Sequence, residues 1–259
     1  MLKEYLSNIA NALRQTLGLN DKINAQDFAN KVGEVYEKGQ QVEYDKFWDA
    51  LQINGTRVSY QSAFWRWSSD VFYPKYDIVS GATNAESMFR YLDYERYLQG
   101  ENVYFDLAQR LEDCGVVLDI SQATHASYMF SYAYNITRVP ALDCSSATTA
   151  QNIFQQCRRL VTVDKFILPS TDNSFNFSNA FIYCYALENI TFEGLICTNI
   201  DFSYSPLTSQ SMLSVIERLK DYSNNGGTHT ITFKADRETM LTDEQKAIAT
   251  NKGWSLVWN

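Results

Sequence analysis

The sequence is short of the residues that mark disulfide-rich, zinc-binding and membrane proteins. It has five cysteines, an odd number, and no Cys-x-x-Cys pair, so neither a disulfide scaffold nor a zinc site is indicated. No stretch reaches the roughly 20 apolar residues of a membrane-spanning helix. Lys3 and Glu4 stand where a signal peptide has its apolar core. We expect buried free thiols in a chain that is made in the cytoplasm and not inserted into a membrane.

The sequence motifs of common enzymes are absent as well. The chain contains no Gly-x-Gly-x-x-Gly, Walker, Gly-x-Ser-x-Gly or His-Glu-x-x-His segment. Its two histidines, His125 and His229, stand apart from any second metal ligand or nucleophile. We expect His125 to face solvent and His229 to be partly buried. The sequence thus predicts a protein that is not an enzyme and needs no metal or cofactor, although its many carboxylates leave a glycosidase pair open.

Basic residues are outnumbered by acidic ones. Lys and Arg number 22 against 30 Asp and Glu, which gives a formal net charge of -8 in 259 residues. Such a charge opposes binding to the phosphate backbone of nucleic acids and to anionic membranes. Hydrophobic residues, at 45%, provide for a substantial core, and the length allows one large domain or two small ones. We therefore do not expect nucleic acid as a partner.

What the sequence does contain is an internal repeat. Residues 82–89, 123–130 and 147–154 share the frame Ala-Thr-x-Ala-x-x-(Met/Ile)-Phe, and weaker copies end at Phe64 and Phe181. The separations between successive marker phenylalanines are 25, 41, 24 and 27 residues, so one unit carries an insertion of about 16 residues around Tyr91 to Leu107. Apolar residues also recur six and nine positions after the marker, at Ile136, Val139, Leu160, Val163, Leu187 and Ile190.

This period predicts the fold. Units of this size cannot bury their apolar sides alone and stack on their neighbours. We therefore predict an α/β fold in which residues 56–206 form a solenoid with one continuous core. Phe154–Val163 and Phe181–Ile190 share the frame Phe-x-x-Cys-x-x-Leu-x-x-(Val/Ile), which resembles the BspA-like leucine-rich repeat. The resemblance implies one short parallel strand per unit on one side, turns or short helices on the other, and Cys157 and Cys184 at small buried positions.

The two ends differ from the repeats. Apolar residues at steps of three and four over Leu2–Leu13 predict a helical attachment or oligomerisation segment within 1–55. Residues 207–259 are predicted to form a capping α/β unit of helix, strand, helix and strand, with a capping box at Thr242 and Gln245. Both ends are similar to proteins encoded among bacteriophage tail and prophage genes, including fibre-like and baseplate-associated proteins; the segments concerned are 9–18, 23–28 and 241–256.

Aromatic residues are abundant, with 17 Tyr, 15 Phe and 5 Trp. They provide large contact surfaces at a small entropy cost. Tyrosines flank the marker phenylalanines on both sides, and these neighbours cannot all point inward; two tryptophans two residues apart would share one face of an extended segment. The alternative is packing between units and beneath the insertion. The candidate binding residues are Trp65, Trp67, Tyr91, Tyr128, Tyr132, Tyr134, Tyr183 and Tyr185.

Together these features predict a non-enzymatic protein of the phage tail, fibre or baseplate, located in the virion. We expect it to bind other phage tail proteins and a host cell-surface protein or glycan through its repeats. The fibre-like resemblance implies a homo-oligomer, a trimer. Two alternatives stay open: a bacterial leucine-rich-repeat adaptor or adhesin that mediates protein-protein interaction, and a polysaccharide depolymerase.

Overall fold

The computed structural model describes residues 83–170, 175–224 and 228–259 of the chain. The helical segment predicted within 1–55, the weak repeat copy that ends at Phe64, and the candidate binding residues Trp65 and Trp67 lie outside the described residues. The architecture below therefore concerns the part of the chain that begins at Thr83.

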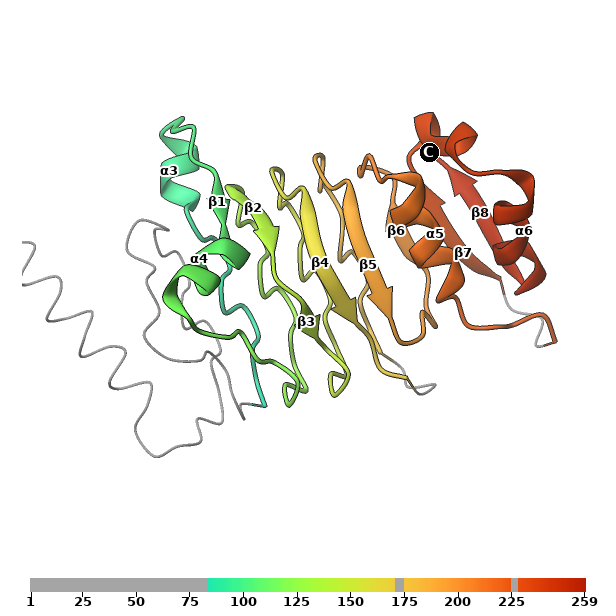
Figure 1. Cartoon of the computed structure of the whole chain (residues 1–259), viewed down its shortest axis with the longest axis horizontal. Coiled ribbons are helices and arrows are strands. Elements are labelled where there is room, and N and C mark those ends of the chain that lie inside the picture. Colours follow the sequence, from blue (N-terminus) through green and yellow to red (C-terminus); the bar gives the residue numbers. More distant parts are fainter. Residues whose placement is uncertain (1–82, 171–174, 225–227) are drawn as a thin grey trace, which may run out of the picture. The chain divides into compact units, whose positions relative to one another are not determined.

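A five-stranded parallel sheet, the main sheet, is formed by β1 (Phe105–Asp106), β2 (Ile136–Val139), β3 (Leu142–Asp143), β4 (Thr162–Ile167) and β5 (Asn189–Glu193). β1 pairs with β2, and β4 pairs with β2, β3 and β5. β2 contacts the first half of β4 and β3 the second half, because Pro140 between them has no N–H to donate. Figure 1 shows β2, β4 and β5 side by side.

A second parallel sheet is formed by β6 (Ile200–Phe202), β7 (His229–Phe233) and β8 (Trp254–Trp258). The helix α5 (Ser209–Glu217) precedes β7, and the 3-10 helix η2 (Ala235–Met240) and α6 (Asp243–Asn251) lie between β7 and β8. α6 begins with the predicted capping box: Thr242 Oγ1 accepts the N–H of Gln245 at 3.2 Å, and Gln245 Oε1 accepts the N–H of Thr242 at 2.9 Å. The predicted helix, strand, helix, strand order is confirmed.

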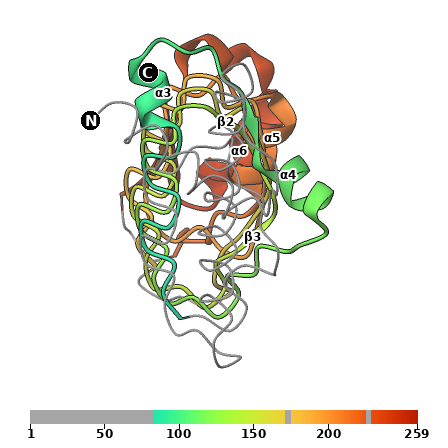
Figure 2. The ribbon, with the colours of Figure 1, turned by 90° about the vertical axis from the view of Figure 1, so that its left-hand side faces the viewer.

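The repeated frames form a ladder of turns on the side away from the main sheet (Figure 2). We call residues 84–92, 125–133, 149–157 and 176–184 the turn ladder. Parallel bridges join Asn84, His125, Thr149 and Asn176 in that order. In the first three turns every second N–H donates to the next turn, as Phe130 N does to Ile153 O at 2.8 Å, and most intervening N–H groups bond within their own turn. Equivalent residues of successive units therefore lie beside each other.

The marker phenylalanines form the centre of the core. Phe89, Phe130, Phe154 and Phe181 stack in a column with ring centroids 5.2, 5.4 and 5.6 Å apart. Phe202 and Phe233 continue the column at 4.6 and 6.1 Å. The positions predicted to point inward are all buried: Ile136, Val139, Leu160, Val163, Leu187 and Ile190. The sequence period thus predicted the core residues correctly.

The predicted leucine-rich-repeat solenoid, with one strand per unit, is wrong. The described residues form one sheet of five strands and a separate sheet of three. β1 comes from the insertion and β3 is a second strand in the unit of β2, so strands and units do not correspond one to one. The main sheet ends at β5 because two serines of α5 bond to its N–H groups: Ser211 Oγ accepts from Ile190 at 3.0 Å and Ser214 Oγ from Phe192 at 2.9 Å. What holds of the prediction is the α/β class.

The five cysteines are free thiols in two environments. Cys144, Cys157 and Cys184 are fully buried, and the S–H groups of the latter two donate to the carbonyls of Phe130 and Phe154 at 3.0 and 3.1 Å. Burial raises the pKa of these three thiols far above the ordinary value. The predicted burial is confirmed for these three and wrong for Cys114 and Cys197, which are partly exposed.

A chromogenic thiol reagent should separate these two classes. We expect Cys114 and Cys197 to react in the native protein, and Cys144, Cys157 and Cys184 only after unfolding, because the reagent needs an accessible thiolate. Absorbance of the released chromophore, with and without denaturant, counts the thiols of each class. Rapid native reaction of a third thiol would contradict the burial described above.

Candidate binding surface

Tyrosines gather where the chain leaves the turn ladder and crosses to the strands. Residues two positions after each column phenylalanine are neighbours there, because the N–H groups of Tyr91, Tyr132 and Gln156 each donate to the next turn, at 3.0, 2.8 and 2.9 Å. Residues four positions after the phenylalanine form a second row. We call this surface the tyrosine edge: Tyr91, Tyr94, Tyr97, Tyr132, Tyr134, Gln156, Arg158, Tyr183, Tyr185 and Tyr204.

Five rings form the first group of the edge. Tyr91 stacks on Tyr132 with ring centroids 4.9 Å apart and planes at 16°. Tyr94 and Tyr97 both contact Tyr134, at 5.7 and 4.1 Å. Tyr134 is only 7% exposed, and burial raises the pKa of its hydroxyl. It therefore serves as the packed base of the group.

Three rings form the second group, which is more open. Tyr183 lies 4.7 Å from Tyr204 and 6.0 Å from Tyr185, and Tyr185 lies 5.7 Å from Tyr204. Tyr185 is 50% exposed and Tyr204 37%. The neighbouring Tyr183 side chain raises the pKa of the Tyr204 hydroxyl. The group thus offers both apolar ring area and hydrogen-bonding hydroxyls to a partner.

Gln156 and Arg158 connect the two groups. They occupy in their unit the positions that Tyr132 and Tyr134 hold in the preceding one. Arg158 Nε donates to Gln156 Oε1 at 2.9 Å, and the guanidinium carbon lies 5.0 Å from the centre of the Tyr134 ring. The edge is therefore a continuous row in which tyrosine rings flank one ordered cation.

The backbone at the edge is in a conformation that tyrosine disfavours. Tyr91, Tyr132, Gln156 and Tyr183 have φ of 62°, 62°, 65° and 61°. This left-handed region costs a bulky L residue about 1–2 kcal/mol and is easier for Asn and Gly. The same conformation recurs two positions before each phenylalanine, where the residues are mostly small and polar: Ser87, Tyr128, Asn152 and Asn179. The edge therefore holds tyrosines where the backbone prefers other residues.

The insertion completes one end of the edge. Its helix α3 (Tyr94–Leu98) carries Tyr94 and Tyr97 and lies beside the point where the chain leaves the ladder (Figure 2). The segment after it forms β1 and then α4 (Leu107–Cys114), which begins at Asp106, whose carboxylate accepts the N–H of Gln109 at 2.9 Å. The insertion is thus folded against the repeats rather than projecting from them.

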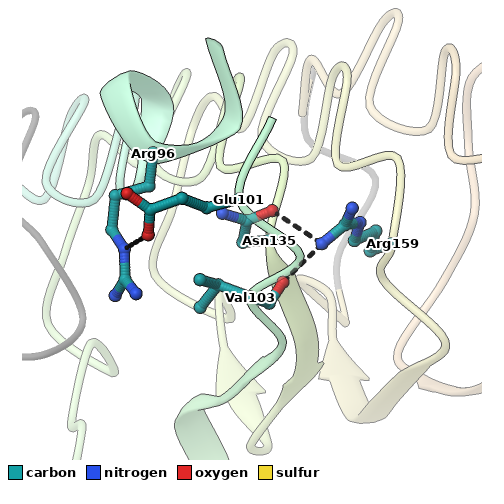
Figure 3. Close-up of polar contacts among 5 residues, drawn as sticks. All are labelled: Arg96, Glu101, Val103, Asn135 and Arg159. Carbon is teal, nitrogen blue, oxygen red and sulfur yellow. Dashed lines mark hydrogen bonds and ion pairs between the residues drawn. The ribbon is translucent and has the colours of Figure 1, made fainter. Parts of the chain in front are cut away.

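Polar contacts hold the segment between α3 and β1 (Figure 3). Arg96 pairs with Glu101 at 2.7 Å. Arg159 Nη1 donates to the backbone oxygen of Val103 at 2.5 Å and to the side-chain oxygen of Asn135 at 3.1 Å. Because Asn135 is fully buried, it anchors the arginine and, through it, the insertion. Removing the insertion would therefore also disturb the tyrosines that pack beneath it.

The structure brings together most of the candidate residues that it describes. Tyr91, Tyr132, Tyr134, Tyr183 and Tyr185 all belong to the tyrosine edge. Tyr128 lies in the same turn as Tyr132 but before the phenylalanine, where it packs under the guanidinium of Arg90 at 4.8 Å. The residues that sequence reasoning missed are Tyr94, Tyr97, Gln156, Arg158 and Tyr204. Treating Phe202 as a further marker would have found Tyr204, and comparing equivalent positions would have found Gln156 and Arg158.

The two histidines lie outside the edge. His125 is exposed and its Nδ1 lies 2.9 Å from Thr124 Oγ1, while His229 is partly buried and stacks on Tyr222 at 3.7 Å, so both placements predicted from the sequence are confirmed. Within residues 83–170, 175–224 and 228–259, no three His, Cys, Asp or Glu side chains converge as metal ligands do.

No helix in the described part of the chain is both long enough and apolar enough to cross a bilayer. Comparison with protein-family models, with curated proteins and with solved structures finds no match to this chain.

Proposed function

We propose that the protein is a non-enzymatic binding protein that contacts a protein partner through the tyrosine edge. Tyrosine and arginine are enriched in protein interfaces, where rigid rings give contact area at a small entropy cost. Tyr91 and Tyr132 stack and cover each other's inner ring faces, whereas Tyr183 and Tyr204 pack tilted, with their planes at 52°. Ring edges and hydroxyls are left for a partner, which suits protein contacts better than stacking of sugar rings.

The observation that carries this proposal is the left-handed backbone beneath the edge tyrosines. A residue kept where the backbone disfavours it points to a role of its side chain, because selection for stability alone favours Asn or Gly at such positions. The chain does place Asn in this conformation at Asn152 and Asn179. It uses Tyr at three of the four equivalent edge positions, Tyr91, Tyr132 and Tyr183.

The biological setting that we propose is a phage tail, with a neighbouring tail protein or a host cell-surface protein as the partner. The similarity of segments 9–18, 23–28 and 241–256 to phage tail proteins supports this setting. The second candidate, a bacterial adaptor or adhesin, uses the same edge without a virion. Tail, holin and lysin genes beside the coding gene, and the protein's presence by mass spectrometry in purified particles, would separate the two; its absence from particles would remove the phage setting.

Replacing Tyr183 with Asn should weaken binding and leave folding intact. We expect the free energy of unfolding to stay the same or rise by up to about 1 kcal/mol, because Asn relieves the left-handed strain. Binding to host cells, followed by flow cytometry, or to purified neighbouring tail proteins should fall about tenfold, as for loss of one interface tyrosine.

Val257→Asn is the matched control, because Val257 is 41% exposed on β8 and not part of the edge. It should leave partner binding unchanged. If Tyr183→Asn left partner binding intact, the proposed function would be wrong, and an accompanying loss of stability would show that the tyrosine serves the fold alone.

A further inference from the structure

Three arginines border the tyrosine edge without a carboxylate partner. Arg90, Arg158 and Arg159 make no ion pair with any residue that the structure describes. By contrast, Arg138 on β2 forms a two-bonded pair with Asp164, at 2.8 and 2.9 Å. Carboxylates are not scarce in a chain with a net charge of -8. No carboxylate in the described part of the chain therefore neutralises these three arginines.

Tyrosine rings hold the guanidinium groups of Arg90 and Arg159. The Arg90 guanidinium carbon lies 4.8 Å from the ring centre of Tyr128 and 5.1 Å from that of Tyr91. That of Arg159 lies 4.7 Å from the ring centre of Tyr104, which is 63% exposed. A cation over a ring is attracted to the ring face and keeps its charge. Both groups are thus positioned and still cationic.

Arg158 is the most ordered of the three. Its Nε and Nη1 donate to Gln156 Oε1 and to the Tyr97 hydroxyl, at 2.9 and 3.1 Å. Its Nη2 donates to no described residue. A guanidinium that is already held through Nε and Nη1, with Nη2 available to donate, loses little conformational freedom when it binds an anion. Arg158 is therefore preorganised for an acidic group.

We propose that the tyrosine edge binds an acidic segment of a protein partner, with Arg158 donating to a carboxylate and Arg90 and Arg159 flanking it. This inference rests on the proposed function and specifies the chemistry of the partner. Charge-assisted hydrogen bonds from Arg to carboxylate are among the stronger polar contacts at interfaces. The tyrosines between the arginines contact the apolar side chains of the same segment.

The small number of charges favours a protein over an anionic polymer. Three arginines lie at the edge, each against a tyrosine ring, whereas a polymer with a charge on every repeat requires a dense cationic stripe. Carboxylates interspersed with apolar side chains match such a surface. A sulfated or phosphorylated polysaccharide is the competing ligand that the test must separate.

The test uses the full chain and a labelled peptide of repeated Glu-Leu-Glu-Tyr units, with fluorescence anisotropy as the readout. We expect saturable binding that weakens with added salt. The same peptide with Gln in place of Glu should bind at least about tenfold more weakly, in line with the loss of charged hydrogen bonds. Arg158→Gln should weaken binding of the acidic peptide by a similar factor, without a change in melting temperature.

Arg218→Gln is the control variant, because it removes the same charge from an exposed arginine at the end of α5 that makes no ion pair with a described residue. It should leave peptide binding unchanged. Equal loss in both variants would show a net-charge effect and overturn the proposal, as would tighter binding of dextran sulfate than of the acidic peptide. The proposed function fails by a different result, namely unchanged partner binding by Tyr183→Asn.

Discussion

Replacing Phe154 with alanine will lower the free energy of unfolding by about 3–5 kcal/mol, the range for removal of a fully buried aromatic ring. The Phe154 ring is inaccessible to solvent and stacks between Phe130 and Phe181, at 5.4 and 5.6 Å. It also meets the edge of Phe166 at 5.9 Å, so it links the turn ladder to the main sheet. Domains of this kind are stable by only about 5–15 kcal/mol, so the loss will be a large fraction of the total.

Urea unfolding followed by far-ultraviolet circular dichroism measures this loss. Leu98→Ala is the control, because Leu98 is 59% exposed on α3 and its truncation should change the free energy of unfolding by less than about 0.5 kcal/mol. If Phe154→Ala cost no more than Leu98→Ala, the column of phenylalanines would not be the core of the protein.

The core could be predicted because it depends on residue type at a fixed spacing. Phe130, Phe154 and Phe181 recur with their neighbours in register, and any fold that places equivalent residues side by side buries them. The capping box at Thr242 and Gln245 could be predicted for a similar reason, since it depends only on residues close in sequence. Local and periodic features are therefore visible in the sequence of this chain.

The sheet arrangement could not be predicted in this way, because it depends on which backbone groups find partners. The N–H groups at the outer edge of β5 bond to Ser211 and Ser214 instead of a further strand. The two serines lie about 20 residues downstream and outside the repeat frame, so the repeat period could not predict their contacts with β5. Pro140 likewise lies between two strands, β2 and β3, in a unit for which one strand was predicted.

The candidate site was predicted in part for the same reasons. Tyr132, Tyr134, Tyr183 and Tyr185 flank marker phenylalanines and could be selected from the repeat alone. The insertion has no equivalent in the other units, so the sequence could not place Tyr97 against Tyr134 at 4.1 Å. A long-range contact of this kind follows from the folding of the insertion onto the ladder, which Arg159 and buried Asn135 maintain.

The turn ladder explains how the fold supports the tyrosine edge, the surface that we propose for binding. Its backbone hydrogen bonds run between successive turns and hold Tyr91 and Tyr132 in the left-handed conformation, which Tyr183 also adopts. Burial of the phenylalanine two residues earlier in each turn stabilises the fold and offsets the free-energy cost of this backbone strain. The side chains at Tyr91, Tyr132 and Tyr183 can therefore be exchanged with little effect on the phenylalanine column beneath them.

Gly194→Ala will destabilise the protein by about 2–5 kcal/mol. Gly194 follows β5 with φ of 82°, and a Cβ there would lie 2.2 Å from the backbone oxygen and 2.7 Å from the carbonyl carbon of Leu168. The left-handed conformation costs alanine about 1–2 kcal/mol, and moving a packed backbone typically adds about 1–3 kcal/mol. The Leu168 carbonyl cannot move away easily, because the neighbouring Leu168 N–H donates to Glu193 O at 2.9 Å.

Gly115→Ala separates the two contributions. Gly115 ends α4 with φ of 65°, and no atom lies within 4 Å of the position that its Cβ would take. This variant should lose only the conformational part, about 1–2 kcal/mol. Guanidinium unfolding of both variants, with hydrogen exchange of the Leu168 N–H, measures the difference. Equal losses, with unchanged exchange at Leu168, would show that the close approach of Gly194 to Leu168 does not contribute to the stability of the fold.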